Sequence, residues 1–189
     1  MKRRKLIKFG LLTGTGVAVS TLIPGCKGEL LEIDLETYTP KLFTENQYQF
    51  LQSYANVLLP SSDTPGAAST GLVQIMDRIE HAISDKESHQ NLMTKVQMLS
   101  DYFNHQHEEQ KWSDLDGEKQ EAFVASMDTK LTSGDAEVSK VYKEIKQKLV
   151  HYFLNTEEVG TELLNFLPVP GEYQACVSLD ETGNKAWTI

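Results

Sequence analysis

Apolar residues recur at helical spacing along almost the whole body of this chain, and strict alternation of apolar and polar residues is nearly absent. A stripe with a period of about 3.6 residues is buried by packing one helix against another. Such stripes occupy five stretches of the sequence: 44–59, 69–83, 84–110, 118–131 and 136–153. A short further helix is expected over 156–164. We therefore expect an all-α fold, a compact bundle of five or six helices.

The expected helix ends are marked by capping residues and prolines. Thr44, followed three residues later by Gln47, forms a capping-box pair at the start of the first helix. Helical backbone is disfavoured before a proline, so this helix should end at Leu59, before Pro60. The second helix should begin at about Ser69 and bury an apolar stripe. The members of this stripe are Leu72, Ile75, Met76, Ile79 and Ile83.

The segments on either side of the bundle differ from it in composition. We interpret residues 1–25 as an export signal, residues 26–43 as a tether, and residues 44–189 as the helical domain. From about residue 165 the chain has prolines and too few apolar positions for a helix. We expect an extended C-terminal tail there, with a hairpin around residues 182–184.

The amino-terminus carries the clearest targeting signal. The first 25 residues hold five basic side chains and no acidic one. The uncharged segment 10–25 is shorter than the roughly 20 apolar residues of a membrane span. The pair Arg3-Arg4, followed by two apolar residues and Lys8, resembles the twin-arginine motif, which directs folded proteins to the periplasm. A Sec signal that happens to contain two arginines is the alternative.

Two cysteines, Cys26 and Cys176, allow different assignments. Cys26 follows a small residue at the end of the apolar segment, as in a lipoprotein cleavage box, and would then carry a lipid that anchors the chain to a membrane. The alternative is a cysteine near an ordinary cleavage site. In an exported protein the two could also form a disulfide. Acylation of Cys26 would instead leave Cys176 as a buried thiol.

The charge of the remaining chain argues against nucleic-acid binding. The sequence has 18 basic and 27 acidic residues. Because five of the basic residues lie in the signal, the rest of the chain has 13 basic residues against 27 acidic ones, an excess of 14 negative charges. Such a body repels the phosphate backbones of nucleic acids.

The loop 58–72, with the sequence LLPSSDTPGAASTGL, is rich in small and polar residues, as some phosphate-binding loops are. A phosphate cradle needs successive backbone N–H groups, several glycines and usually a lysine. Pro65 removes one N–H, Asp63 has the wrong charge, and no basic residue lies nearby. We therefore expect a rigid corner between two helices, with Pro65 and Gly66 in a type II turn.

No combination of residues predicts a catalytic, cofactor or metal site within this chain. The sequence has no GxGxxG fingerprint, no GxSxG elbow and no CxxC pair. His105 and His107 would point away from each other on a helix, so they do not predict chelation of one ion. Two aromatic residues of the tail, Tyr173 and Trp187, either pin it to the bundle or anchor a partner.

Three features of the sequence occur together. They are the Arg-Arg signal, a Leu59-Pro60 step followed by Asp-Thr-Pro-Gly-Ala at 63–67, and a closing pattern of Pro170-Gly171, Cys176 and Trp187. In combination they resemble the gluconate 2-dehydrogenase subunit 3 family. The resemblance extends over roughly residues 42–187, although the middle helices carry no specific motif.

This resemblance implies a non-catalytic small subunit. Its partner would be a catalytic flavoprotein of the glucose–methanol–choline oxidoreductase type, which holds FAD and oxidises a sugar or polyol, with a cytochrome c as a candidate electron acceptor. The small subunit would support assembly of the flavoprotein and carry it into the periplasm. The candidate partner contacts are Pro65, Gly66, Tyr173 and Trp187. The alternative is a free-standing periplasmic lipoprotein that binds a ligand or acts as an export chaperone.

Overall fold

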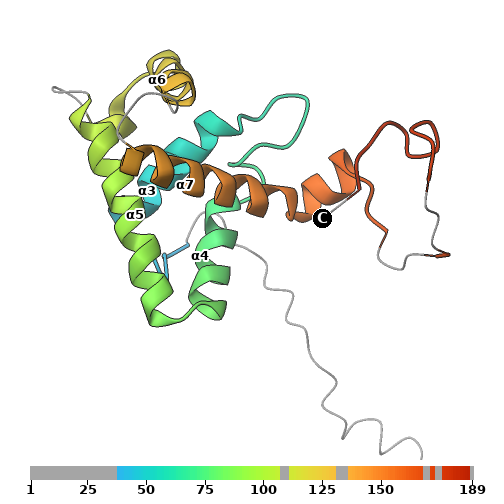
Figure 1. Ribbon diagram of the computed structural model, residues 1–189, viewed down its shortest axis with the longest axis horizontal. Helices are drawn as coiled ribbons and strands as arrows, with labels where there is room; N and C mark the ends of the chain where they lie inside the picture. Colours follow the sequence, from blue (N-terminus) through green and yellow to red (C-terminus); the bar gives the residue numbers. More distant parts are fainter. Residues whose placement is uncertain (1–37, 107–110, 131–135, 168–170, 173–175, 188–189) are drawn as a thin grey trace, which may run out of the picture. The chain divides into compact units, whose positions relative to one another are not determined.

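The computed structural model describes residues 38–106, 111–130, 136–167, 171–172 and 176–187 (Figure 1). Within these residues the fold is all-α, as predicted. It contains five α-helices: α3 (Glu45–Leu58), α4 (Leu72–Ile83), α5 (Lys86–His105), α6 (Gly117–Lys130) and α7 (Ala136–Leu154). A 3₁₀ turn, η1 (Trp112–Asp114), precedes α6, and a π-helical turn, η2 (Val159–Leu163), follows α7.

The expected export signal lies outside the described residues, and so do Arg3, Arg4 and Cys26. Among the helices that are described, none combines the length and the apolar character that a membrane-spanning segment requires.

Helix α3 makes contacts with α4, α5, α6 and η1. Its start is fixed by the predicted capping box, in which the Gln47 backbone N–H donates to the Thr44 hydroxyl and the Thr44 N–H donates to Gln47 Oε1. The helix buries one apolar face, on which Leu51 and Tyr54 are fully enclosed. Such burial stabilises the fold by about 1.5–3 kcal/mol for each large apolar side chain.

Aromatic rings fill the space between α3, α5 and η1. The Phe103 ring lies 5.4 Å from that of Phe50, 5.5 Å from that of Tyr54 and 4.8 Å from that of Trp112. These pairs meet edge to face, the arrangement that the charge distribution of aromatic rings favours. The apolar stripe predicted within 84–110 is buried in α5, where its members are Leu92, Val96, Leu99 and Phe103. Helix α7 packs across α5 and α4 and covers the other side of the core (Figure 1).

Helix α4 begins at Leu72, three residues later than predicted. Gly71 has a left-handed backbone with φ 60° and ψ 30°, which interrupts the helical path. Before it, the Thr70 hydroxyl donates to the carbonyl oxygens of Gly66 and Ala67. The residues before Gly71 therefore form a turn instead of the first turn of the helix.

The buried face of α4 also differs from the predicted stripe. Ile79 is 37% exposed and Ile83 is 74% exposed, whereas Asp77 and Glu80 are buried. Periodicity assigns the apolar residues to the core, but both acids have hydrogen-bond partners inside the fold, which lowers the cost of burying them. The predicted burial of Ile79 and Ile83 was wrong.

The C-terminal segment does not form the predicted hairpin. Its turn ends at Gly183 and Asn184, which have left-handed backbones with φ of 62° and 59°. The Asn165 side-chain amide donates to the carbonyl oxygens of Thr182 and Lys185, and an isolated parallel bridge joins Asn165 to Trp187. Within the described residues, the tail is therefore held at the end of η2 by Asn165 and by the Lys185 side chain, which donates to the Glu162 carbonyl, and not by a partner strand.

Candidate functional site

Asp77 binds the segment that leads into α3. This carboxylate is fully buried and accepts hydrogen bonds from the Tyr38 hydroxyl at 2.5 Å and from the backbone N–H groups of Lys41, Leu42 and Phe43 at 2.7, 3.0 and 3.0 Å. Burial, followed by the hydrogen bond to Asp77, raises the pKa of Tyr38. Residues 38–43, the end of the expected tether, therefore belong to the folded body.

Glu80, one turn further along α4, joins this helix to α7. It accepts hydrogen bonds from Lys148, from the Tyr152 hydroxyl at 2.9 Å and from the Ser84 hydroxyl at 2.9 Å. Burial alone would raise the pKa of Glu80, but these hydrogen bonds and the Lys148 charge outweigh it and hold the pKa below its usual value. Burial and the hydrogen bond to Glu80 raise the pKa of Tyr152.

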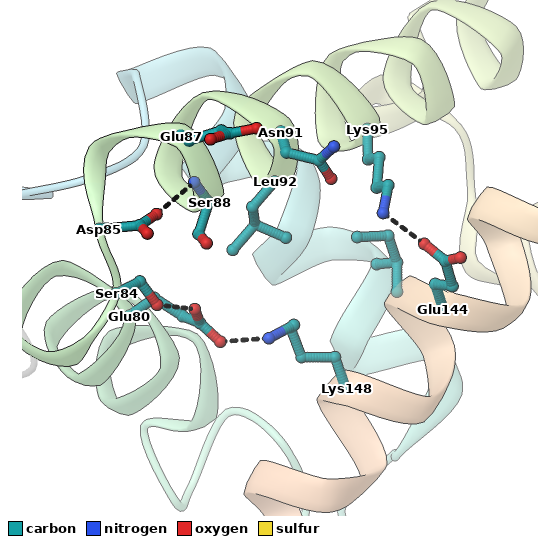
Figure 2. Close-up of a pocket in the computed structure, with 11 residues that line it drawn as sticks. Glu80, Ser84, Asp85, Glu87, Ser88, Asn91, Leu92, Lys95, Glu144 and Lys148 are labelled. Carbon is teal, nitrogen blue, oxygen red and sulfur yellow. Dashed lines mark hydrogen bonds and ion pairs between the residues drawn. The ribbon is translucent and has the colours of Figure 1, made fainter.

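The Glu80 network forms one wall of a cleft of about 420 Å³ between the α4–α5 turn and α7 (Figure 2). On the opposite wall, Lys95 reaches Glu144 at 2.6 Å. Asp85 caps α5 by accepting from the Ser88 N–H at 2.8 Å. The two ion pairs, Glu80–Lys148 and Lys95–Glu144, therefore connect α4 and α5 to α7 across the cleft.

Lowering the pH should weaken the contact that Glu80 makes between α4 and α7. Folding lowers the pKa of the Glu80 carboxylate below the value of 4.5 that it has in the unfolded chain. The contribution of this carboxylate to stability is therefore fully present above pH 4.5 and is lost as the pH falls through the lower, folded-state pKa. We expect Glu80→Gln to reduce the free energy of unfolding by about 1–3 kcal/mol at neutral pH, and the difference from the wild type to shrink below pH 4.5. Urea unfolding at several pH values measures both, and a difference that stays constant with pH would contradict this assignment.

The corner between α3 and α4 is compact, as expected, but its turn was assigned wrongly. The Ala67 N–H donates to the Leu59 carbonyl at 2.9 Å, and the Gly66 N–H donates to the Ser69 hydroxyl at 3.0 Å. Gly66 does not have the positive φ that a type II turn requires. It is buried where the chain folds back on itself, so its hydrogen side chain is needed for space and not for backbone freedom.

The other candidate partner contacts have different surroundings. Pro65 is half-buried, and Trp187 is 51% exposed beside its bridge to Asn165. Tyr173 lies outside the described residues. Large exposed apolar side chains recur along the described end of the chain: Phe166, Leu167, Val177, Leu179 and Trp187. We refer to these five as the exposed tail residues.

Cys176 is exposed, so the buried position expected for its thiol was wrong, and its possible disulfide partner Cys26 lies outside the described residues. Cys176 lies in the C-terminal segment, where the described neighbours on either side are also exposed. His105 is exposed near the end of α5, and His107 lies outside the described residues. The ring centroids of His81 and His89 lie 5.9 Å apart. No group of three metal-ligating side chains occurs within the described parts of the chain.

A comparison with protein families identifies the family of this helical body. A family model described as Gluconate 2-dehydrogenase subunit 3 matches residues 45–171, more than half of the sequence. The chain belongs to the gluconate 2-dehydrogenase subunit 3 family. The matched range includes the corner, the cleft and η2, and it ends before Cys176 and Trp187. Comparison with curated proteins and with solved structures gave no match.

Sequence reasoning missed the two buried acidic residues of α4, Asp77 and Glu80. Val73, Asp77 and Glu80 are spaced four and three residues apart, so they share one face of α4. That spacing could have placed the two acids beside the buried Val73. Apart from Ser84, which lies four residues from Glu80, their partners could not have been identified in the same way, because they lie 34 to 72 residues away along the chain.

Proposed function

We propose that this chain is the non-catalytic small subunit of a periplasmic, flavin-dependent sugar or polyol dehydrogenase. Membership of the gluconate 2-dehydrogenase subunit 3 family carries the proposal, because the family is described as one subunit of a dehydrogenase. The two ion pairs across the cleft are consistent with it, since they connect helices to one another.

The catalytic partner in this proposal is a flavoprotein of the glucose–methanol–choline type that holds FAD, with a cytochrome c as electron acceptor. The sequence of the small subunit gives a reason why the catalytic flavoprotein would need it. It joins an Arg3-Arg4 signal to a body without a dinucleotide-binding motif. A route that exports folded proteins suits a partner that must bind FAD before it crosses the membrane. The small subunit would carry that partner through the membrane by the twin-arginine route.

The exposed tail residues supply a docking surface for this partner. Large apolar side chains that remain in contact with water cost free energy, which is recovered when another protein covers them. Trp187 is the strongest anchor among them, because tryptophan is enriched among the residues that contribute most to protein–protein binding. The acidic surface of the chain favours a partner with a basic docking face.

Substitution of Lys for both Arg3 and Arg4 should leave most of the flavoprotein in the cytoplasm, because the paired arginines are the feature of the signal that specifies the twin-arginine route. The measurement is the flavin-dependent dehydrogenase activity of periplasmic and cytoplasmic fractions, with both subunits expressed together. We expect at least a tenfold loss of periplasmic activity while the total amount of flavoprotein is retained.

Lys2→Arg and Lys5→Arg are the matched controls, because they keep the charge and leave the arginine pair intact. Normal export of the flavoprotein with the altered signal, or without this chain, would overturn the proposal and favour the free-standing lipoprotein. The same fractions test the proposed lipid anchor. An acylated Cys26 keeps the wild-type chain with the membranes, and Cys26→Ser should release it.

A further inference from the structure

A groove lies where the end of α3 meets α6 and α7. Its volume is about 410 Å³. Residues from these three helix segments line it: Val57, Leu58, Leu59, Glu121, Val124, Ala125, Asp128, Lys146 and Val150. Most of them are apolar, so this groove differs from the charged cleft beside α4. None of the exposed tail residues lines it.

The groove forms because α6 and α7 pack against different neighbours. Helix α6 contacts α3, whereas α7 contacts α4 and α5. A polar connection joins α6 to α7 at one point. There, Asp128 of α6 accepts hydrogen bonds from the Tyr142 hydroxyl at 2.8 Å and from Lys146 Nζ at 2.7 Å, both on α7. These bonds fix the distance between the two helices beside the apolar lining.

The apolar lining of the groove can be reached from solvent. Of its six apolar residues, four are half-buried, Ala125 is exposed and only Val124 is buried. The wall at the end of α3 is held in place by the corner, because the Ala67 N–H donates to the Leu59 carbonyl at 2.9 Å. Apolar surface that the fold covers only in part is stabilised when another protein covers the rest.

The charges of the groove are unequally paired. Lys146 Nζ lies 2.7 Å from each of the two carboxylate oxygens of Asp128, so these two charges offset each other. Glu121 is exposed, and it forms no ion pair within the described residues. The groove therefore presents one uncompensated negative charge next to apolar surface.

This combination selects the kind of partner that fits. A ligand that is polar throughout would lose hydrogen bonds to water against the apolar lining. Glu121 would repel an acidic segment. A second copy of this chain is disfavoured for the same reason, because outside the signal each copy has 27 acidic residues against 13 basic ones. An aliphatic side chain next to an arginine or lysine suits both features, since the first covers the groove and the second pairs with Glu121.

We propose that this groove receives a segment of the catalytic flavoprotein in which an aliphatic residue lies next to a basic one. The inference rests on the proposed function, because it assumes that the flavoprotein is the partner. It adds a docking surface on the helical body to the one that the exposed tail residues supply. Two contacts on one chain strengthen each other, because the second forms within the complex once the first has formed.

Ala125→Lys tests the groove from an exposed position on α6. The new ammonium group covers the apolar lining, and it pairs with Glu121 four residues earlier on the same helix face. We expect the dissociation constant of the purified full-length chain for the purified flavoprotein to rise about tenfold or more. The melting temperature of the isolated chain should not fall, because lysine is a good helix former and gains an ion pair.

Ala122→Lys is the matched control. Ala122 is also exposed on α6, lies four residues after an acid, Glu118, and does not line the groove. The substitution therefore makes the same change in charge and the same kind of helical ion pair, and it should alter the dissociation constant by no more than about twofold.

A second variant keeps the test decisive if Ala125→Lys unfolds the chain. Glu121→Gln removes only the uncompensated charge, so the affinity should fall about threefold at low salt and should depend less on salt concentration than that of the wild type. A salt dependence equal to that of the wild type would overturn the assigned role of Glu121 and with it this inference.

The outcomes separate the two proposals. If the wild-type chain does not bind the flavoprotein, the proposed function fails. If the wild-type chain binds and folded Ala125→Lys binds as tightly as Ala122→Lys, the proposed function stands and this inference fails. Sedimentation of the chain alone tests the remaining occupant. A wild-type dimer that Ala125→Lys converts to a monomer, with unchanged flavoprotein binding, would make the groove a contact between copies and would also overturn the inference.

Discussion

Replacing Asp77 by alanine should lower the free energy of unfolding by about 3–5 kcal/mol, because buried hydrogen-bond donors would then lose a charged acceptor. Three backbone N–H groups, those of Lys41, Leu42 and Phe43, and the Tyr38 hydroxyl donate to this one carboxylate. Leu42 and Phe43 also bury their side chains in the core. The substitution should therefore release the segment before α3 together with part of the apolar core, and urea unfolding at neutral pH measures the loss.

Asp63→Ala is the matched control, because Asp63 is exposed in the corner and its substitution should change stability by no more than about 0.5 kcal/mol. Asp77→Asn separates charge from shape. The asparagine oxygen can accept part of the donor set, so we expect an intermediate loss. Equal stability of the Asp77→Ala and Asp63→Ala variants would show that the segment 38–43 is held by its apolar residues alone.

The parts of the fold that depend on local sequence were predicted well. The capping box at Thr44 and the buried stripe of α5 each involve residues within a few turns of one helix, so periodicity and capping rules find them. The face of α4 was predicted wrongly because its buried acids have distant partners. Tyr152 lies 72 residues from Glu80, and Tyr38 lies 39 residues from Asp77. No local pattern contains that information.

At the candidate site too, features set by the local sequence were predicted, and features set by distant contacts were not. The sequence predicted that residues 58–72 form a corner, because proline, glycine and short polar residues have known turn preferences. It did not predict that Gly66 is needed for space, nor that the side-chain oxygen of Gln74 is buried without a hydrogen-bond partner within the described residues. Both facts depend on how two separate segments approach each other. A turn rule that considers one position at a time can only predict a glycine with positive φ. At this corner the structure has positive φ at Gly71 and not at Gly66.

Gly66→Ala should destabilise the chain by about 3 kcal/mol, the upper end of the usual range for overpacking. A Cβ atom at this position would lie 2.7 Å from the carbonyl carbon of Pro60 and closer still to the backbone nitrogen of Ser61. Flexible side chains can move away from a new methyl group, but here the obstacle is backbone. The turn must therefore shift, and the Ala67 N–H, which donates to Leu59, moves with it. Thermal and urea unfolding of the purified chain measure the loss.

Gly117→Ala provides the control for the chemical change itself. No atom lies within 4 Å of a Cβ built on Gly117, and this glycine is the first residue of α6. The added methyl group should therefore stabilise the chain by up to about 1 kcal/mol. The contrast between the two glycines separates crowding at the corner from a general effect of alanine. A Gly66→Ala variant that folds and is equally stable, but does not bind the flavoprotein, would instead assign Gly66 to the contact surface. Backbone crowding at the corner would have lowered the stability as well.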